Sequence, residues 1–207
     1  DLVTGVQTCA LPIFSEVKAS QCLYDDIAAK GGRPIMWKTG HSLMKAKLKA
    51  ESAVLAGEMS GHMFFADRYF GFDDAIYASC RLVEILAKTK HSLSSLVADL
   101  PQTTVTPEIR VDCSDSVKFQ LVEQVHRQLA SYLEAGQPVG ASTLRMRELV
   151  TIDGVRAIFE DGWGLIRASN TQPALVLRFE APSPARLDVI RATIETELAQ
   201  ARRVLSV

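Results

Sequence analysis

The stretch Ala53–His62, AVLAGEMSGH, joins a short apolar run to a polar loop that contains two glycines. The run AVLA predicts a β-strand, and the glycines of GEMSGH allow the backbone to turn sharply and to approach a ligand closely. Glu58, Ser60 and His62 place a carboxylate, a hydroxyl and an imidazole in that loop. Because open α/β sheets bind ligands at the carboxyl ends of their strands, the stretch predicts an α/β domain with a ligand-binding loop.

The composition of the 207 residues is that of a globular protein, with 47% hydrophobic and 23% charged residues. The formal net charge of −1 gives no reason to expect a nucleic acid or an anionic membrane as partner. No apolar run reaches the length that a bilayer requires. The cysteines show no paired spacing: they are Cys9, Cys22, Cys80 and Cys113. Scattered, reduced cysteines predict a cytoplasmic protein.

Residues 1–13, DLVTGVQTCALPI, resemble the translation of a sequencing adapter, and they lack the basic region and cleavage site of a signal peptide. We therefore expect them to be an artefactual leader outside the fold. On that interpretation the native protein continues upstream of Phe14, and this chain is its C-terminal part. The alternative is a native N-terminal strand at Leu2–Thr4.

Strands alternate with helices through residues 14–101, which predicts an α/β domain with a mainly parallel, doubly wound sheet. Ser42 is expected to cap the helix that runs to Ala50, and Asp73 or Asp74 the helix that runs to Lys88. The apolar residues of the helix that runs to Lys88 share one face: Ile76, Cys80, Val83 and Ala87. The other expected segments are a strand from Phe14, a helix over 20–30, a strand at 34–37 and a short helix at 92–100.

Residues 102–207 show a different order of predicted segments and are expected to form a second domain. A polar, proline-bounded linker, Pro101–Pro107, marks its start. Asp153-Gly154 between two apolar runs is a strong hairpin signal. The expected segments are strands at 108–113, 148–152, 155–159, 162–167 and 174–179, and helices at 116–133 and from Ser183 onward. They predict an α+β domain, in which two helices back an antiparallel sheet.

The loop Arg167–Pro173, RASNTQP, lies between two predicted strands of the second domain. Arg167 offers a planar set of donors that suits a phosphate. Ser169, Asn170 and Thr171 add further donors for the same anion. The same residues also suit a tight turn in which they satisfy local backbone groups. Loop chemistry alone leaves both interpretations open.

A sugar phosphate would use both polar loops, because it carries hydroxyls at one end and a dianion at the other. Glu58 can accept from neighbouring hydroxyls, Ser60 can donate and accept, and His62 can transfer a proton near neutral pH. Lys18 and His41 lie in other loops of the same domain and are expected to border the same site. The alternatives are a local turn cap for Glu58, a structural role for His62, and simple solvent exposure for the other two.

These motifs resemble the α-D-phosphohexomutase family. MWKTGHS (Met36–Ser42), GEMSGH and FGFDD (Phe70–Asp74) are similar to its substrate-binding stretches, and GWGLIRASNTQP (Gly162–Pro173) is similar to its phosphate-binding loop. The pairing of GEMSGH with RASNT is most similar to bacterial phosphomannomutases/phosphoglucomutases. Phosphoglucosamine mutases typically have a glycine where Asn170 stands. The resemblance extends from about Ser15 to the C-terminus.

The resemblance implies that the chain corresponds to the third and fourth domains of a four-domain enzyme that interconverts hexose 1-phosphate and hexose 6-phosphate through a bisphosphorylated sugar. It implies a role in acid/base chemistry for His62, and it implies contacts with the hexose phosphate from Lys18, His41, Glu58, Ser60, Arg167, Ser169, Asn170 and Thr171. Beside Lys18, Glu16 and Ala19 differ from the Asp and Cys that are usual in relatives.

The resemblance also implies that the reactive groups of the family belong to parts that this sequence does not contain. The phosphorylated serine and the Mg²⁺ site lie in the first two domains, and no SHNP-type or DGDxDR-type motif is present in this sequence. The chain alone is therefore expected to bind glucose or mannose phosphates, to hold no metal and to lack mutase activity. The alternatives are a non-catalytic sugar-phosphate-binding module and a mutase of the phosphoglucosamine type.

Overall fold

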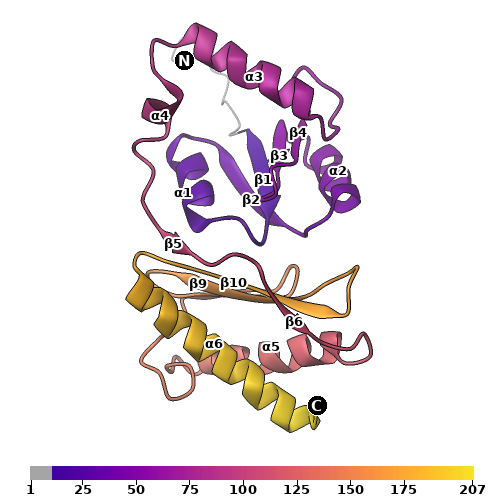
Figure 1. The fold of residues 1–207 in the computed structure, drawn as a ribbon, viewed down its shortest axis with the longest axis vertical. Helices are drawn as coiled ribbons and strands as arrows, with labels where there is room; N and C mark the ends of the chain where they lie inside the picture. Colours follow the sequence, from indigo (N-terminus) through magenta and orange to yellow (C-terminus); the bar gives the residue numbers. More distant parts are fainter. Residues whose placement is uncertain (1–10) are drawn as a thin grey trace. The chain divides into compact units, whose positions relative to one another are not determined.

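The computed structural model describes residues 11–207, which form two compact units divided between Pro101 and Gln102 (Figure 1). Most of the expected leader (residues 1–10) and the alternative strand Leu2–Thr4 lie outside the described residues. Each unit has its own sheet and its own hydrophobic core. No helix within 11–207 is long and apolar enough to span a bilayer.

The sheet of the N-terminal unit is mainly parallel, as predicted. Its strand order is β2-β1-β3-β4, in which β1 pairs in parallel with β2 and β3, and β4 pairs antiparallel with β3. The strands are β1 (Pro12–Glu16), β2 (Arg33–Trp37), β3 (Leu55–Gly57) and β4 (Met63–Phe65). β1 begins two residues before the expected start of the fold, because Pro12 and Ile13 continue its register with β2. Strand β4 was not predicted.

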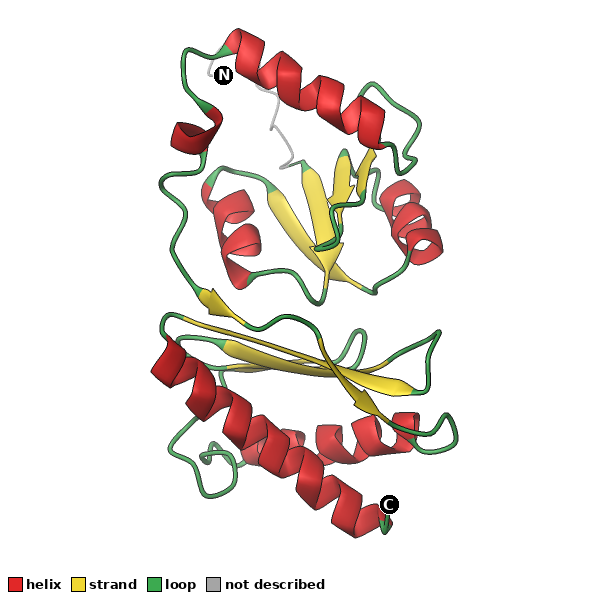
Figure 2. Cartoon of the chain, in the orientation of Figure 1, coloured by secondary structure: helices red, strands yellow, loops and turns green. Residues whose placement is uncertain are grey.

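The helices of this unit agree with the predicted segments except at one cap. They are α1 (Gln21–Ala29), α2 (His41–Ala50), α3 (Ala75–Lys88) and α4 (Leu93–Leu96), and α1 and α2 lie on opposite sides of the sheet in Figure 2. Asp74 caps α3 by accepting from the backbone N–H of Tyr77 at 2.8 Å. The prediction that Ser42 caps α2 is wrong: the cap is Gly40, whose φ of 127° favours glycine, and no side chain caps this helix.

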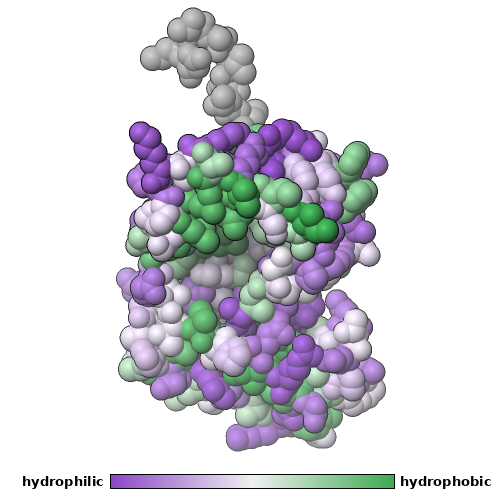
Figure 3. Space-filling model, turned by 45° about the horizontal axis from the view of Figure 1, so that its top comes forward, coloured by the Kyte–Doolittle hydropathy of each residue, from purple (hydrophilic) through white to green (hydrophobic). Residues whose placement is uncertain are grey.

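Apolar side chains of the N-terminal unit are divided between a small core and the surface. The core consists of Phe14, Met44, Leu48, Ala53, Ala56 and Phe64. The predicted apolar stripe of α3 is exposed instead, with Ile76 80% and Val83 64% accessible. Figure 3 shows hydrophobic patches among hydrophilic surface on this unit. Helix α3 therefore owes little of its stability to apolar burial within the described residues.

The sheet of the C-terminal unit is antiparallel, as predicted, and has six strands in the order β5-β10-β9-β8-β7, with β6 also paired to β10. The strands are β5 (Thr104–Val105), β6 (Ile109–Asp112), β7 (Glu148–Val150), β8 (Val155–Ile158), β9 (Trp163–Ala168) and β10 (Ala174–Ala181). The expected linker Pro101–Pro107 contains β5, so part of it belongs to this sheet. The expected hairpin around Asp153-Gly154 is present between β7 and β8.

Two helices back this sheet, in agreement with the prediction. They are α5 (Lys118–Glu134) and α6 (Pro184–Leu205), and they lie together on one face of the sheet in Figure 2. The hydroxyl of Ser183 caps α6 by accepting from the N–H of Arg186 at 3.4 Å. Leu121 and Leu129 of α5 and Ile190 and Ile194 of α6 are at most 1% exposed within a core that also includes the inner residues of β8, β9 and β10.

A cation lies over each of the two tryptophans. In the N-terminal unit the Lys47 Nζ lies 4.1 Å from the ring centroid of Trp37. In the C-terminal unit the Arg156 guanidinium lies 3.8 Å from the ring centroid of Trp163, and both of these residues are buried. Attraction between a cation and an aromatic face is stronger when the pair is desolvated, so the pair in β8 and β9 is the more stabilising of the two.

Glu197 of α6 is a carboxyl group that folding buries. It is 1% exposed, and burial raises its pKa above the ordinary 4.5, against a hydrogen bond from Gln128 Nε2 at 3.2 Å that lowers it. A carboxyl group whose pKa is higher in the folded chain stabilises the fold while protonated. Its contribution is therefore complete below pH 4.5 and is lost as the pH rises through the raised value.

We expect Glu197→Gln to increase the free energy of unfolding at pH 7, because the amide removes the buried charge and keeps the side-chain size. The gain should shrink at pH 4, where the wild-type carboxyl is protonated. Urea unfolding at the two pH values measures both. The matched control is Glu195→Gln on the exposed side of the same helix, which should show no such pH-dependent gain. An equal gain in the free energy of unfolding at both pH values would contradict a raised pKa for Glu197.

Candidate functional site

Three loops of the N-terminal unit meet at the carboxyl edge of the parallel strands. They follow β1, β2 and β3, whose carboxyl ends share an edge because these strands run in the same direction. The structure thus brings together the predicted residues Lys18, His41, Glu58, Ser60 and His62. GEMSGH closes the β3–β4 hairpin: the N–H of Glu58 donates to the carbonyl of His62 at 2.9 Å, and Gly61 has a φ of 93°.

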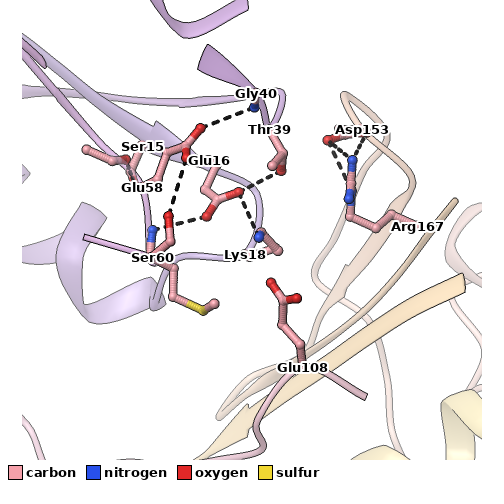
Figure 4. A network of polar contacts seen from close by, with 12 residues as sticks. Ser15, Glu16, Lys18, Thr39, Gly40, Glu58, Ser60, Glu108, Asp153 and Arg167 are labelled. Carbon is pink, nitrogen blue, oxygen red and sulfur yellow. Dashed lines mark hydrogen bonds and ion pairs between the residues drawn. The ribbon is translucent and has the colours of Figure 1, made fainter. Parts of the chain in front are cut away.

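Glu16 is the residue that links the three loops, and sequence reasoning missed it. Its carboxylate accepts from the Thr39 hydroxyl at 2.6 Å and from the Met59 backbone N–H at 3.0 Å, and it lies 3.3 Å from the Lys18 Nζ (Figure 4). Its carbonyl accepts from the Tyr24 hydroxyl at 2.8 Å. Glu16 is fully buried, so these contacts fix the loops relative to one another.

Lys18 is buried rather than solvated, so the simple exposure proposed as its alternative is wrong. The residue is 8% exposed, and its ammonium pairs with the Glu16 carboxylate. An ammonium held at the edge of a parallel sheet is suited to a negatively charged ligand. The partner of Lys18 is thus Glu16, one of the two neighbours that differ from the usual residues of relatives, and the contact of Lys18 with a hexose phosphate stays a prediction.

Glu58 bridges two of the loops. Its carboxylate accepts from the Gly40 backbone N–H at 3.2 Å and from the Ser60 hydroxyl at 3.4 Å (Figure 4). The carboxylate also lies 3.8 Å from the Nε2 of His41. The side chain is 6% exposed. Since Gly40 belongs to a different loop, Glu58 does more than cap its own turn. Its oxygen atoms are preoriented acceptors for hydroxyl groups.

His62 is held by a carboxylate that the sequence suggested only as a helix cap. Its Nδ1 lies 2.6 Å from Asp73 Oδ2, and the other oxygen of Asp73 accepts from the Met63 backbone N–H at 3.2 Å. The His41 and His62 rings meet edge to face, with centroids 4.3 Å apart, and both side chains are nearly half exposed. A carboxylate on one ring nitrogen orients the imidazole and leaves Nε2 as the nitrogen that a ligand would meet.

The adjacent Asp74 has a structural role. The Tyr69 hydroxyl donates to it at 2.5 Å, and this bond, together with the N–H of Tyr77, holds the pKa of the carboxyl below its ordinary value. A negative charge at the first turn of α3 also stabilises the positive end of the helix dipole. Asp73 and Asp74 therefore fix, respectively, the imidazole of His62 and the start of α3.

The second predicted loop follows β9 in the C-terminal unit, and its arginine is paired within the protein. Arg167 is 6% exposed and contacts Asp153 with two groups: its Nε lies 3.2 Å from Oδ2 and its Nη2 lies 3.1 Å from the same oxygen (Figure 4). Asp153 was expected as a turn residue and not as a partner of Arg167. The pair holds the planar guanidinium in one orientation.

The residues after Arg167 form a tight turn, the alternative that the sequence left open. The Ser169 Oγ accepts from the backbone N–H groups of Thr171, at 3.4 Å, and Gln172, at 3.2 Å. Asn170 and Thr171 are exposed. The buried Lys118 of α5 donates to the carbonyl of Gln172 at 2.9 Å and places a further cation beside the turn. The predicted convergence of donors is thus only partly present.

A hollow of about 210 Å³ lies beside this turn. Its lining comes from α5, from the β7–β8 turn and from the start of the loop, and includes Phe119, His126, Asp153, Gly154 and Asn170. Asn170 is therefore accessible to a solute, and Asp153 both lines the hollow and contacts the guanidinium of Arg167.

Comparison with known proteins finds one family for both units. Residues 5–104 match the domain described as "Phosphoglucomutase/phosphomannomutase, alpha/beta/alpha domain III", and residues 108–197 match "Phosphoglucomutase/phosphomannomutase, C-terminal domain". The chain belongs to the phosphoglucomutase/phosphomannomutase family. This agrees with the resemblance to the phosphohexomutases and with the predicted third and fourth domains.

Similar members of the family come from several bacteria. The chain is 47% identical over 186 residues to a phosphomannomutase/phosphoglucomutase of Pseudomonas putida, and 44% identical over 179 residues to a phosphoglucomutase of Neisseria gonorrhoeae. These alignments cover 90% and 86% of the chain but only 37% and 36% of the relatives. A crystal structure of a family protein from Burkholderia thailandensis matches with a TM-score of 0.78 and 41% identity, and covers 93% of this chain and 38% of that one. The chain thus spans little more than a third of these relatives.

The residues of this family member do not fit Mg²⁺, the ion that the resemblance implies for another domain. Within 11–207, the group of side chains that could hold a metal consists of His41, His62 and Asp73. Mg²⁺ prefers oxygen ligands in an octahedral arrangement, whereas this group offers two imidazole nitrogens and one carboxylate.

Proposed function

We propose that the chain binds hexose phosphates and is the substrate-binding part of a phosphomannomutase/phosphoglucomutase, which interconverts hexose 1-phosphate and hexose 6-phosphate. The observation that carries the proposal is the convergence of Lys18, His41, Glu58, Ser60 and His62 at the carboxyl edge of a parallel sheet, in a chain whose relatives bear that enzyme name. Glucose and mannose phosphates are the proposed ligands, and we propose the cytoplasm as the location.

The sugar ring would bind to the GEMSGH loop. The Glu58 carboxylate, held by the N–H of Gly40, accepts from neighbouring hydroxyls of the sugar, and Ser60 donates or accepts beside it. Because these contacts address a pair of adjacent hydroxyls, they accept sugars that differ at a hydroxyl outside the pair. This supports a site that takes both glucose and mannose phosphates.

His62 would move a proton between the sugar and the enzyme. An efficient general acid or base needs a fixed orientation within hydrogen-bond reach of the proton that it moves. The contact between Nδ1 and Asp73 supplies the orientation. It also stabilises the imidazolium that forms when Nε2 takes a proton from a hydroxyl group.

The phosphate would bind to the turn that begins at Arg167. The guanidinium already presents a fixed plane of donors, and an incoming dianion would share it with Asp153 or replace that carboxylate. Asn170 and Thr171 are exposed and can add donors. In the complete enzyme, Mg²⁺ and a phosphorylated serine of other domains would supply charge neutralisation and the transferred phosphoryl group.

Arg167→Ala is expected to weaken the binding of glucose 6-phosphate and of inorganic phosphate at least about tenfold, because charge-assisted bonds to a phosphate are lost. Glu58→Gln is expected to weaken only glucose 6-phosphate, because inorganic phosphate has no sugar hydroxyls. Titration of the ¹⁵N-labelled chain with each ligand, followed by NMR, measures both affinities.

The matched control is Arg191→Ala, which removes an exposed arginine that pairs with Glu195 on α6 of the same unit. It should leave both affinities unchanged. Unchanged glucose 6-phosphate affinity in the Arg167 variant would show that the turn is structural only. From the sequence we expect that this chain alone lacks mutase activity. Turnover of glucose 1-phosphate by the isolated chain with Mg²⁺ and a bisphosphate activator, at the rate of an intact mutase, would contradict that expectation.

A further inference from the structure

Two histidines and one carboxylate meet beside the GEMSGH loop. His41, His62 and Asp73 each offer one ligand atom, and these atoms all lie within 4.8 Å of one another. Two imidazole nitrogens with a carboxylate oxygen are a donor set that proteins use for Zn²⁺ and similar ions. We propose that these three side chains form a Zn²⁺-binding site, although the sequence alone predicted no metal ligand in this chain.

The three ligands stand on backbone that is fixed independently of any metal. His41 is the first residue of α2, and the carbonyl of His62 accepts from the N–H of Glu58 across the hairpin at 2.9 Å. Asp73 forms a β-bridge with Phe64. One oxygen of Asp73 accepts from the Met63 N–H at 3.2 Å, so the other faces His62. Such outer contacts orient metal ligands and strengthen binding.

The geometry requires small side-chain movements only. Zn²⁺ binds nitrogen and oxygen at 2.0–2.2 Å, which places neighbouring ligands of a tetrahedron about 3.3 Å apart. His62 Nδ1 and Asp73 Oδ2 are 2.6 Å apart and would separate slightly, while the atom of His41 would move closer. The three side chains are 26–45% exposed, so they are free to adjust and a water can complete the coordination. The Glu58 carboxylate, 3.8 Å from His41 Nε2, adds negative charge beside the cation.

Occupancy of this site would oppose the binding of a hexose phosphate. This second part rests on the proposed function, which assigns His41 and His62 to the substrate. A Zn²⁺ ion on the Nδ1 of His62 would leave the proton on Nε2, so that Nε2 could no longer accept from a sugar hydroxyl, and the ion would also occupy a ring nitrogen of His41. By linkage, the sugar phosphate would weaken the binding of the metal. Zinc would therefore be a competitive inhibitor that acts at the sugar loop.

Isothermal titration of the complete 207-residue chain with Zn²⁺, without sugar, tests the site itself. We expect one equivalent to bind, with an affinity that falls at least about tenfold in His62→Ala and in Asp73→Asn, since each removes a ligand. The chain has two further histidines, so His91→Ala and His126→Ala are the matched controls and should bind as the wild type does. Cys80→Ser, which removes an exposed thiol, should also have no effect.

Absence of binding up to a concentration on the order of 1 mM, or an equal loss in the histidine controls, would overturn the proposal. Circular dichroism of each variant confirms that the fold is retained. The competition is measured by repeating the glucose 6-phosphate titration at saturating Zn²⁺, where the affinity should fall in the wild type and not in Asp73→Asn. If Zn²⁺ binds but sugar phosphate binds equally well with and without it, the metal site stands and only the competition fails. If no sugar phosphate binds in the absence of metal, the proposed function fails instead.

Discussion

Glu16→Ala is expected to destabilise the N-terminal unit by about 3 kcal/mol or more, the usual result of removing one member of a buried ion pair. The carboxylate is fully buried, and its loss deprives the buried Lys18 of a close counter-charge. The Thr39 hydroxyl and the Met59 N–H lose their acceptor at the same time. Because Glu16 joins three loops, we expect the sugar loop to become mobile before the sheet unfolds. Hydrogen exchange of peptides from residues 11–101 measures both effects.

Two further variants separate the buried network from ordinary charge effects. Glu51→Ala removes a carboxylate of the same unit that has two cationic partners, Arg33 and Lys47, but lies nearer the surface. Its effect on stability should be much smaller. Glu16→Gln keeps the size of the side chain, so its loss of stability should lie between those of Glu16→Ala and Glu51→Ala. If the two variants Glu16→Ala and Glu51→Ala show equal protection from hydrogen exchange, the proposal that Glu16 holds the three loops together is contradicted.

Gly154→Ala is expected to destabilise the C-terminal unit by about 2–4 kcal/mol, which combines an unfavourable backbone conformation with overpacking. Gly154 has a φ of 85°, and an added Cβ would lie 2.4 Å from the carbonyl oxygen of Ile166 and 2.5 Å from the Cβ of Arg167. Backbone atoms cannot move aside as a flexible side chain can. Strand β9 would shift, and Arg167 with it, so phosphate affinity should fall together with stability.

The matched control for this substitution is Gly136→Ala. Gly136 also has a positive φ, of 61°, but an added Cβ there meets no atom within 4 Å. It should show the backbone penalty alone, about 1 kcal/mol. Thermal unfolding of the two variants therefore measures the contribution of the close approach to β9. If both variants lose the same stability, then β9 yields to the added methyl group and the close contact has little energetic weight.

Much of the fold could be predicted because it depends on local patterns. The alternation of strands and helices gave the parallel sheet, and Asp153-Gly154 gave the β7–β8 hairpin. Strand β4 could not be predicted in the same way, since it has three residues and is defined by pairing with β3 rather than by its own pattern. The predicted cap of α2 was wrong. Ser42 has a side chain that suits a cap, but the backbone conformation of Gly40 decides where the helix begins.

The candidate site was predictable where a motif carries its own hydrogen-bonding groups, as GEMSGH does. Its supporting residues were not, because their contacts are distant in sequence. Glu16 binds the backbone of Met59, 43 residues away, and Arg167 pairs with Asp153 from another hairpin. A single carboxylate at the end of a strand resembles any solvated residue until the fold places its partners. The roles of the site residues in binding remain predictions that the titrations above test.

The two tryptophans provide each unit with its own optical reporter. Trp37 lies under a lysine in the N-terminal unit, and Trp163 is buried under an arginine in the C-terminal unit. Since the chain contains no other tryptophan, replacing one by phenylalanine leaves emission from a single, known unit. Loss of the packed cation and entry of water change the environment of the indole when that unit opens. The order in which the units unfold, and whether one stabilises the other, can thus be read from the fluorescence of two single-tryptophan chains.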